Sequence, residues 1–129
     1  MNYLSSEEIK EMHDEIIRKT GGLEGVLNEH ALLMLETQPA QSFSGQELYP
    51  NIFSKAAFYL RSINKGHIFI DGNKRTSITA VKVFLSRNNY SFEVETKELK
   101  KFPIDVATKH LSLKEIELWI RNHSKIKNT

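Results

Sequence analysis

The segment at residues 73–88 constrains the fold of this chain most, because it is apolar around most of a helical circumference. Only Thr79, Lys82 and Ser86 leave a narrow polar stripe along it. A helix of this kind is stable when other elements cover it on nearly every side. We therefore expect residues 73–88 to form a central buried helix, starting near Asn73 and surrounded by other helices.

Two other helices are predicted from their start signals. Ser5 and Glu8 have the spacing of a capping box, with a hydrophobic staple around them, and the helix that they open should end near Thr20, before two glycines. Ser112 and Glu115 repeat the same device at the last helix. His13 falls near the apolar face of the first helix, where a satisfied core or boundary histidine is expected.

Helical periodicity also predicts helices over residues 28–36, 51–63 and 96–109. Proline lacks the N–H that a helix interior needs, so Pro103 should break or kink the last of these. In the 28–36 helix the expected buried side consists of Leu32, Leu33 and Leu35.

Residues 38–50 differ in character, because prolines, serines and a glycine interrupt a few apolar side chains. We expect an ordered, exposed flap there, for which a small β-hairpin is a natural form. Residues 90–95 should be extended, and the Lys/Asn-rich residues 125–129 should be a frayed tail. The predicted fold is thus all-α, one domain over residues 1–124, with about six helices.

Composition bounds the function. The chain has 129 residues, no cysteine and a formal net charge of +2. The absence of cysteine excludes a disulfide scaffold, a thiol nucleophile and cysteine-ligated metal. Lysines near residues 97–114 alternate with glutamates, which favours a solvated face over direct binding of nucleic acid. Neither a signal peptide nor an apolar run long enough to cross a bilayer is present, so we expect a cytoplasmic protein without membrane contact.

The chemically densest stretch of the chain covers residues 67–75. The first turn of a buried helix exposes backbone N–H groups and the positive end of the helix dipole, which together attract an anion. Gly72 has no Cβ, so a phosphate can approach the backbone closely. We therefore expect phosphates to be held by Gly72, Asn73, Lys74 and Arg75.

Two further side chains of this stretch suggest group transfer. Asp71 is a hard oxygen ligand beside the expected phosphates, which suits Mg²⁺. His67 lies four residues earlier and can take the proton of an attacking hydroxyl. Phosphoryl transfer needs little beyond positioning, charge neutralisation and such a base. Phe69 is expected to anchor the loop in the core.

Residues 67–76 resemble the signature of the Fic/Doc family, His-x-Phe-x-Asp/Glu-Gly-Asn-x-Arg, and within it the Doc (death-on-curing) branch, Asp-Gly/Ala-Asn-Lys-Arg-Thr. Fic enzymes that transfer AMP carry a second arginine eleven residues after the histidine, where this chain has Ile78, and a small residue where it has Lys74. The resemblance implies that both differences suit the Doc mode, in which the terminal phosphate of ATP is transferred with Mg²⁺.

The resemblance also implies partners. Doc-type toxins phosphorylate a threonine of elongation factor Tu and so arrest translation and growth, and they pair with a Phd-type antitoxin whose disordered tail folds on binding. The expected target-docking flap comprises Gln41, Ser42, Phe43, Ser44 and Gly45.

Other interpretations remain open. The same domain could transfer AMP or another nucleotide to a protein hydroxyl, or could be a catalytically inactive module that binds its antitoxin. The motif could also be a structural turn. Residues 20–25 formally fit a self-inhibition motif of other Fic proteins, but two adjacent glycines favour a turn over the helix that this motif requires.

Overall fold

The computed structural model describes residues 1–127, and within them it confirms an all-α fold of six helices. The helices are α1 (Ser6–Thr20), α2 (Glu29–Thr37), α3 (Ile52–Lys65), α4 (Asn73–Arg87), α5 (Thr96–Thr108) and α6 (Leu113–Asn122). A short 3₁₀ turn, η1 (Gln38–Ala40), precedes the hairpin β1 (Ser42–Phe43) and β2 (Gln46–Glu47), and a second pair joins β3 (Tyr90–Phe92) to β4 (Ser124–Ile126). None of the described helices is long and apolar enough to cross a membrane.

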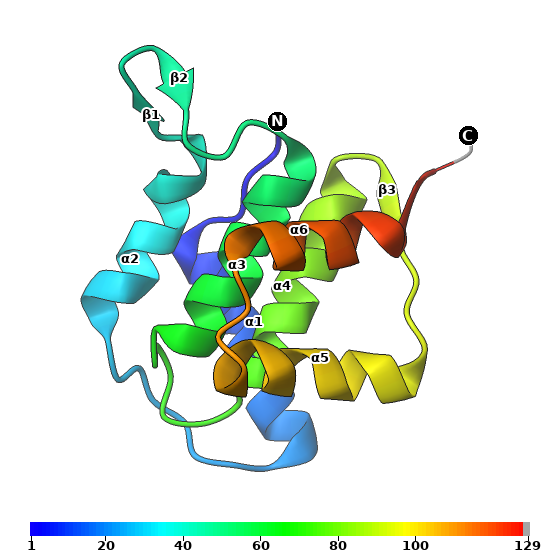
Figure 1. The fold of residues 1–129 in the computed structure, drawn as a ribbon. Helices are drawn as coiled ribbons and strands as arrows, with labels where there is room; N and C mark the ends of the chain where they lie inside the picture. The colour runs from blue at the N-terminus through cyan, green and yellow to red at the C-terminus, as the bar shows by residue number, and fades with distance from the viewer. Residues whose placement is uncertain (128–129) are drawn as a thin grey trace.

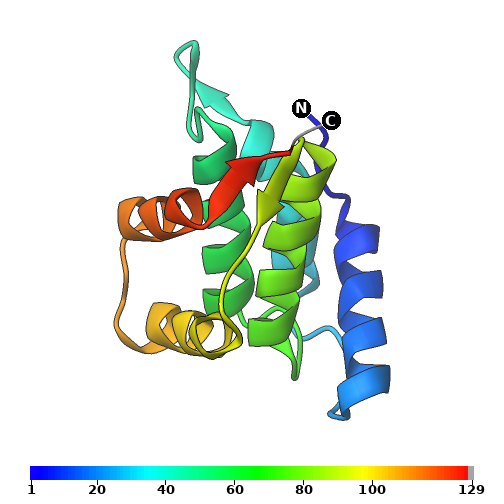
Figure 2. The same ribbon diagram turned by 90° about the vertical axis from the view of Figure 1, so that its right-hand side faces the viewer.

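Helices α3 and α4 lie side by side at the centre, with α1 on one side of them and α5 and α6 on the other (Figures 1 and 2). The predicted central helix is confirmed, since Ala80, Val81, Phe84 and Leu85 are fully buried. Its partner α3 is buried to a similar degree, through Ala56, Ala57, Tyr59, Leu60 and Ile63. The core is therefore built around a helix pair rather than around one helix.

Both predicted capping boxes are present. The Ser5 hydroxyl accepts from the Glu8 N–H at 3.1 Å, and the Glu8 carboxylate accepts from the Ser5 N–H at 3.0 Å. Ser112 and Glu115 repeat the arrangement at α6. Glu8 also pairs with Arg87 of α4, and this hydrogen bond, aided by that from Ser5, lowers the pKa of Glu8 to about 2.

Two details of the helices differ from prediction. Leu33 is 57% exposed, because Leu32 and Leu35, three residues apart, share the buried face of α2 and Leu33 points about 100° away from Leu32. Pro103 does not break α5, which runs unbroken through it. The ring is buried together with Phe102 and Val106, so packing on the core offsets the missing backbone hydrogen bond.

The prediction that the tail is frayed from residue 125 is wrong as far as residue 127. Strand β4 pairs antiparallel with the predicted extended segment, with Tyr90 opposite Ile126, and the Lys127 N–H donates to the Asn89 carbonyl at 2.9 Å. Backbone pairing that local composition does not reveal orders these residues. Residues 128 and 129 of the predicted tail lie outside the described part of the chain.

Candidate active site

The loop between α3 and α4, residues 66–72, carries the predicted site and lies at the lower end of the helix pair in Figure 1. A second loop, residues 21–28 between α1 and α2, runs along it. Val26 forms an isolated antiparallel bridge with Phe69, and the Ile70 N–H donates to the Gly25 carbonyl at 3.1 Å. The Leu27 N–H donates to the Ile68 carbonyl at 2.7 Å. The site is thus built from two loops whose backbones hydrogen-bond each other.

His13 fixes the site loop from the side of α1. Its ring is fully buried and stacks on Phe69, with centroids 3.8 Å apart and planes 5° from parallel. Its Nε2 lies 2.7 Å from the Asp71 carbonyl oxygen, and its Nδ1 lies 3.0 Å from Asp14 Oδ1. Because a carbonyl oxygen can only accept, the contact with Asp71 is a hydrogen bond when Nε2 carries an N–H.

The environment of Asp14 agrees with this arrangement. The Lys10 ammonium, and after it the His13 ring, hold the pKa of the Asp14 carboxyl below its usual value. An ionised Asp14 accepts a hydrogen bond from His13 more strongly than a neutral one would. The prediction that His13 is a satisfied core histidine is confirmed, and its partners are the backbone and the anchor of the site loop.

Asn73 closes the loop on itself. Its side-chain oxygen accepts from the Phe69 N–H at 3.1 Å, and its side-chain nitrogen donates to the Phe69 carbonyl at 2.8 Å. Both ends of the amide are therefore engaged with the loop, and the backbone N–H of Asn73 at the start of α4, together with the second N–H of its amide nitrogen, can still donate to a phosphate.

Asp71 is half-buried and is oriented by the backbone. Its Oδ1 accepts from the Gly72 N–H at 2.9 Å and its Oδ2 from the Leu23 N–H at 3.3 Å. A Cβ on Gly22 would lie only 2.7 Å from Oδ2, so that glycine allows the approach of the two loops. Within residues 1–127 there is no group of three side chains suited to hold a metal, so a cation here would share one carboxylate with phosphate oxygens. Mg²⁺ is commonly bound in this way.

The N-terminus of α4 is open. Gly72 caps it in the left-handed conformation (φ 79°, ψ 11°) without any side-chain hydrogen bond, so the first N–H groups of the helix stay available. Residues 70–75 line a hollow of about 280 Å³ at this end. Lys74 and Arg75 are exposed at its rim, and Arg75 also reaches the Thr20 hydroxyl at the end of α1. The arrangement fits an anion.

His67 is exposed and lies on the loop before this hollow rather than in its lining. Its backbone is left-handed, with φ 46°, a conformation that is uncommon for residues other than glycine. The structure therefore brings Asp71, Gly72, Lys74 and Arg75 together around one hollow, and it leaves the His67 side chain open to an approaching molecule.

The predicted docking flap, residues 41–45, is a hairpin but lies far from the site (Figure 1). The hairpin precedes α3 and the site loop follows it, so the 14 residues of α3 separate them by roughly 20 Å. That the hairpin docks a target stays a prediction, and a target held there would have to span this distance to reach the motif. The loop that flanks the motif is residues 21–28, which is irregular rather than helical, as its glycines predicted.

Buried Lys55 of α3 holds the hairpin in its position. Its ammonium donates to the Pro39 carbonyl at 2.9 Å and to Glu47 of β2 at 3.1 Å, and it lies 5.5 Å from the centre of the Tyr3 ring. The sequence predicted no role for Lys55 as an anchor of the hairpin, because its partners Pro39 and Glu47 lie 16 and 8 positions away along the chain.

Ile78, at the position of the second arginine of AMP-transferring Fic enzymes, is 8% exposed on α4. It lines an apolar hollow of about 470 Å³ between α1, α4 and α5, which Lys74 and Arg75 also border. The apolar residues of its lining are Ile16, Ile78, Leu99, Pro103 and Ile104. This position of α4 therefore presents an apolar side chain where AMP-transferring Fic enzymes have an arginine.

Residues 3–85 match the model of the Fic/DOC family, and the chain belongs to that family. Two curated relatives place it in the Doc branch. It is 29% identical over 116 residues to a protein named Protein kinase doc of Escherichia phage P1, an alignment that covers 90% of each chain. It is 34% identical over 83 residues to Toxin Doc of Mycolicibacterium smegmatis (strain ATCC 700084 / mc(2)155), covering 61% of this chain and 62% of the relative.

Proposed function

We propose that this protein is a Doc-like toxin that transfers the terminal phosphate of ATP to a serine or threonine hydroxyl of a target protein. The observation that carries the proposal is the open N-terminus of α4, where Gly72, Lys74 and Arg75 surround a hollow suited to phosphates beside an exposed histidine. The name of the phage P1 relative, Protein kinase doc, supports a transferase of this kind.

Each residue has a defined part in this proposal. The backbone N–H groups that follow Gly72, together with Lys74 and Arg75, neutralise the phosphates. Asp71 holds Mg²⁺, which would supply further charge neutralisation at the phosphate oxygens. His67 takes the proton of the attacking hydroxyl, a contribution of about 10² to 10⁴-fold in rate.

The environment of Ile78 favours phosphoryl transfer over AMP transfer. A nucleotide whose inner phosphates sit at a second arginine needs a cation at that position, and this chain has an apolar hollow there. A partner segment seated in that hollow would lie against Lys74 and Arg75 and would compete with phosphate. A Phd-like antitoxin is the partner that we propose, and elongation factor Tu is the target expected from the family resemblance.

The test has a growth arm and a chemical arm. Expression of the wild-type chain should arrest bacterial growth, and expression of His67→Ala should not. In vitro, label should pass to the target from ATP labelled at the γ-phosphate. Transfer from the α-labelled nucleotide instead would replace the kinase proposal by nucleotidyl transfer, and arrest that survives His67→Ala would leave a non-catalytic binding module.

A further inference from the structure

A separate hollow of about 450 Å³ lies between α2, the C-terminal half of α3 and the first residue of α6. Buried apolar side chains form its floor, namely Leu35, Phe58 and Ile68, each less than 5% exposed. A hollow of this size and lining can take one or two apolar side chains of a bound molecule. We call it the α2–α3 hollow.

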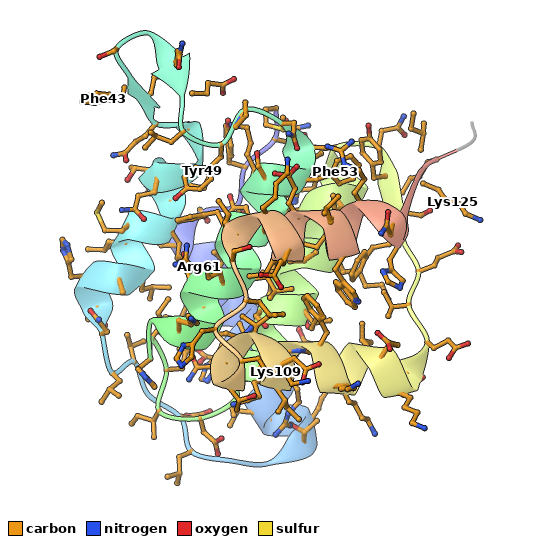
Figure 3. All side chains as sticks on the ribbon, in the orientation of Figure 1. Phe43, Tyr49, Phe53, Arg61, Lys109 and Lys125 are labelled. Carbon is orange, nitrogen blue, oxygen red and sulfur yellow. The ribbon has the colours of Figure 1, made fainter. Side chains whose placement is uncertain are left out.

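The rim of the α2–α3 hollow is positively charged. Arg61 and Lys65 lie one turn apart on α3, about 6 Å along the helix axis. His30 of α2 adds a third basic side chain (Figure 3 labels Arg61 on the side of α3 that faces α2). The Lys65 ammonium lies 3.5 Å from His110 Nδ1. Because this partner carries no negative charge, the charge of Lys65 stays uncompensated.

Nothing in the described part of the chain neutralises this rim. Over residues 1–127 neither Arg61 nor Lys65 forms an ion pair with a carboxylate, and the lining of the hollow contains no aspartate or glutamate. Some other surface cations are paired, for example Lys10 with Asp14 and Lys19 with Glu15. Two adjacent uncompensated cations above an apolar floor are complementary to an acidic segment that carries an apolar side chain.

The hollow adjoins the candidate base. Lys65, Gly66 and Ile68 line it, and His67, which is exposed, lies between them in the chain. A segment that fills this end of the hollow would therefore lie beside the loop that carries His67. This position distinguishes the α2–α3 hollow from the apolar hollow beside Ile78, which borders the phosphate side of the site.

We propose that the α2–α3 hollow docks an acidic segment of the protein substrate and so brings its hydroxyl to His67. This inference rests on the proposed transfer to a protein hydroxyl. An extended chain advances about 3.3 Å per residue. The carboxylates of the segment that pair with Lys65 and Arg61 would therefore lie about two to five residues from its accepting hydroxyl. An apolar side chain of the same segment enters the floor over Phe58 and Ile68.

The binding test uses the full chain with His67→Ala, so that affinity is measured without turnover. The probe is a fluorescent peptide with one threonine, one leucine and glutamates two to five residues from the threonine, and its partner peptide has lysines in place of the glutamates. Fluorescence anisotropy should show binding of the glutamate peptide and little of the lysine peptide. Adding Arg61→Gln and Lys65→Gln should weaken binding about tenfold, since each exposed pair contributes up to about 1 kcal/mol.

The matched control removes two charges elsewhere. Lys82 of α4 and Lys101 of α5 are exposed, lie outside the hollow and form no ion pair within residues 1–127. Lys82→Gln with Lys101→Gln should leave the affinity for the glutamate peptide unchanged. Equal binding of both peptides, preference for the lysine peptide, or equal loss in both double variants would overturn the docking site.

The failure of docking can be told from the failure of the transfer reaction. With His67 intact, the Arg61→Gln, Lys65→Gln variant should raise the KM for the protein substrate and leave kcat nearly unchanged. Transfer with an unchanged KM would refute the docking site and leave the function standing. Peptide binding that depends on Arg61 and Lys65, without transfer to any protein, would uphold the docking of an acidic segment and refute the proposed function.

Discussion

Replacing His13 by phenylalanine separates the stacking of this ring from its hydrogen bonds. Phenylalanine retains the contact with Phe69, whose ring centroid lies 3.8 Å away, but it cannot donate to the Asp71 carbonyl at 2.7 Å. A hydrogen bond of this kind contributes about 0.5–1.5 kcal/mol, and a part-buried carbonyl left without a partner costs about 1–3 kcal/mol more. The second bond, to Asp14, costs less, because that carboxylate keeps Lys10 at 2.8 Å.

We expect His13→Phe to lower the free energy of unfolding by about 2–3 kcal/mol, measured by urea denaturation, out of a total of roughly 5–15 kcal/mol for a domain of this size. Loosening of the site loop should also show in hydrogen exchange. The Phe69 and Ile70 amides, which donate to Asn73 Oδ1 and to the Gly25 carbonyl, should exchange faster relative to the core of α4.

His123→Phe is the matched control. His123 also lies against an aromatic ring, that of Trp119 at 4.7 Å, and its Nδ1 meets the Trp119 carbonyl at 2.7 Å, but it follows α6 and does not contact the site loop. His123→Phe should lower the free energy of unfolding by about 1 kcal/mol and leave the exchange rates of the site-loop amides unchanged. A loss below about 0.5 kcal/mol in His13→Phe, or loop exchange equal to that of the control, would refute the role assigned to His13.

Three further perturbations follow from the packing. Gly22→Ala should displace the Asp71 carboxylate and weaken Mg²⁺-dependent nucleotide binding, measured by calorimetry. Gly21→Ala should leave this binding unchanged, because Gly21 is also at positive φ but has no atom within 4 Å of an added Cβ. Equal effects of the two substitutions would contradict the steric argument. Lys55→Met should lower the free energy of unfolding by about 1–3 kcal/mol and speed the cleavage of the hairpin by chymotrypsin, without altering phosphoryl transfer. An unchanged cleavage rate would contradict the role of Lys55 as the anchor of the hairpin. Glu8→Gln should lower the free energy of unfolding by about 1 kcal/mol at pH 7. Because the pKa of Glu8 in the folded chain is about 2, below the ordinary 4.5, the difference from wild type should shrink as pH falls from 4.5 to 2. A difference that stays constant over this range would contradict the stabilising role of ionised Glu8.

The helices could be predicted from the sequence where their signals are local. The capping boxes at Ser5 and Ser112 and the apolar circumference of α4 involve residues a few positions apart, and all three predictions are confirmed. The strand at the tail could not be predicted, because Tyr90 and Ile126 pair across 36 positions through their backbones. Composition alone therefore suggested fraying where the structure has a sheet.

The site divides in the same way. The anion-binding turn at Gly72 is local and was identified from the chemistry of neighbouring residues. The contact between His13 and Asp71 spans 58 positions and could not be inferred from spacing. The distance between the hairpin and the motif could be predicted, since the predicted helix at 51–63 separates them. Its length, converted to distance, places them at opposite ends of that helix.

The most direct test of the account is the intact mass of elongation factor Tu after incubation with this protein, ATP and Mg²⁺, with His67→Ala as control. The account predicts a gain of one phosphoryl group with the wild-type chain and no gain with the variant. A gain of one AMP would contradict the interpretation of Lys74 and Ile78. A phosphoryl gain that persists in His67→Ala would contradict the assignment of the base, and an unchanged mass would contradict the expected target.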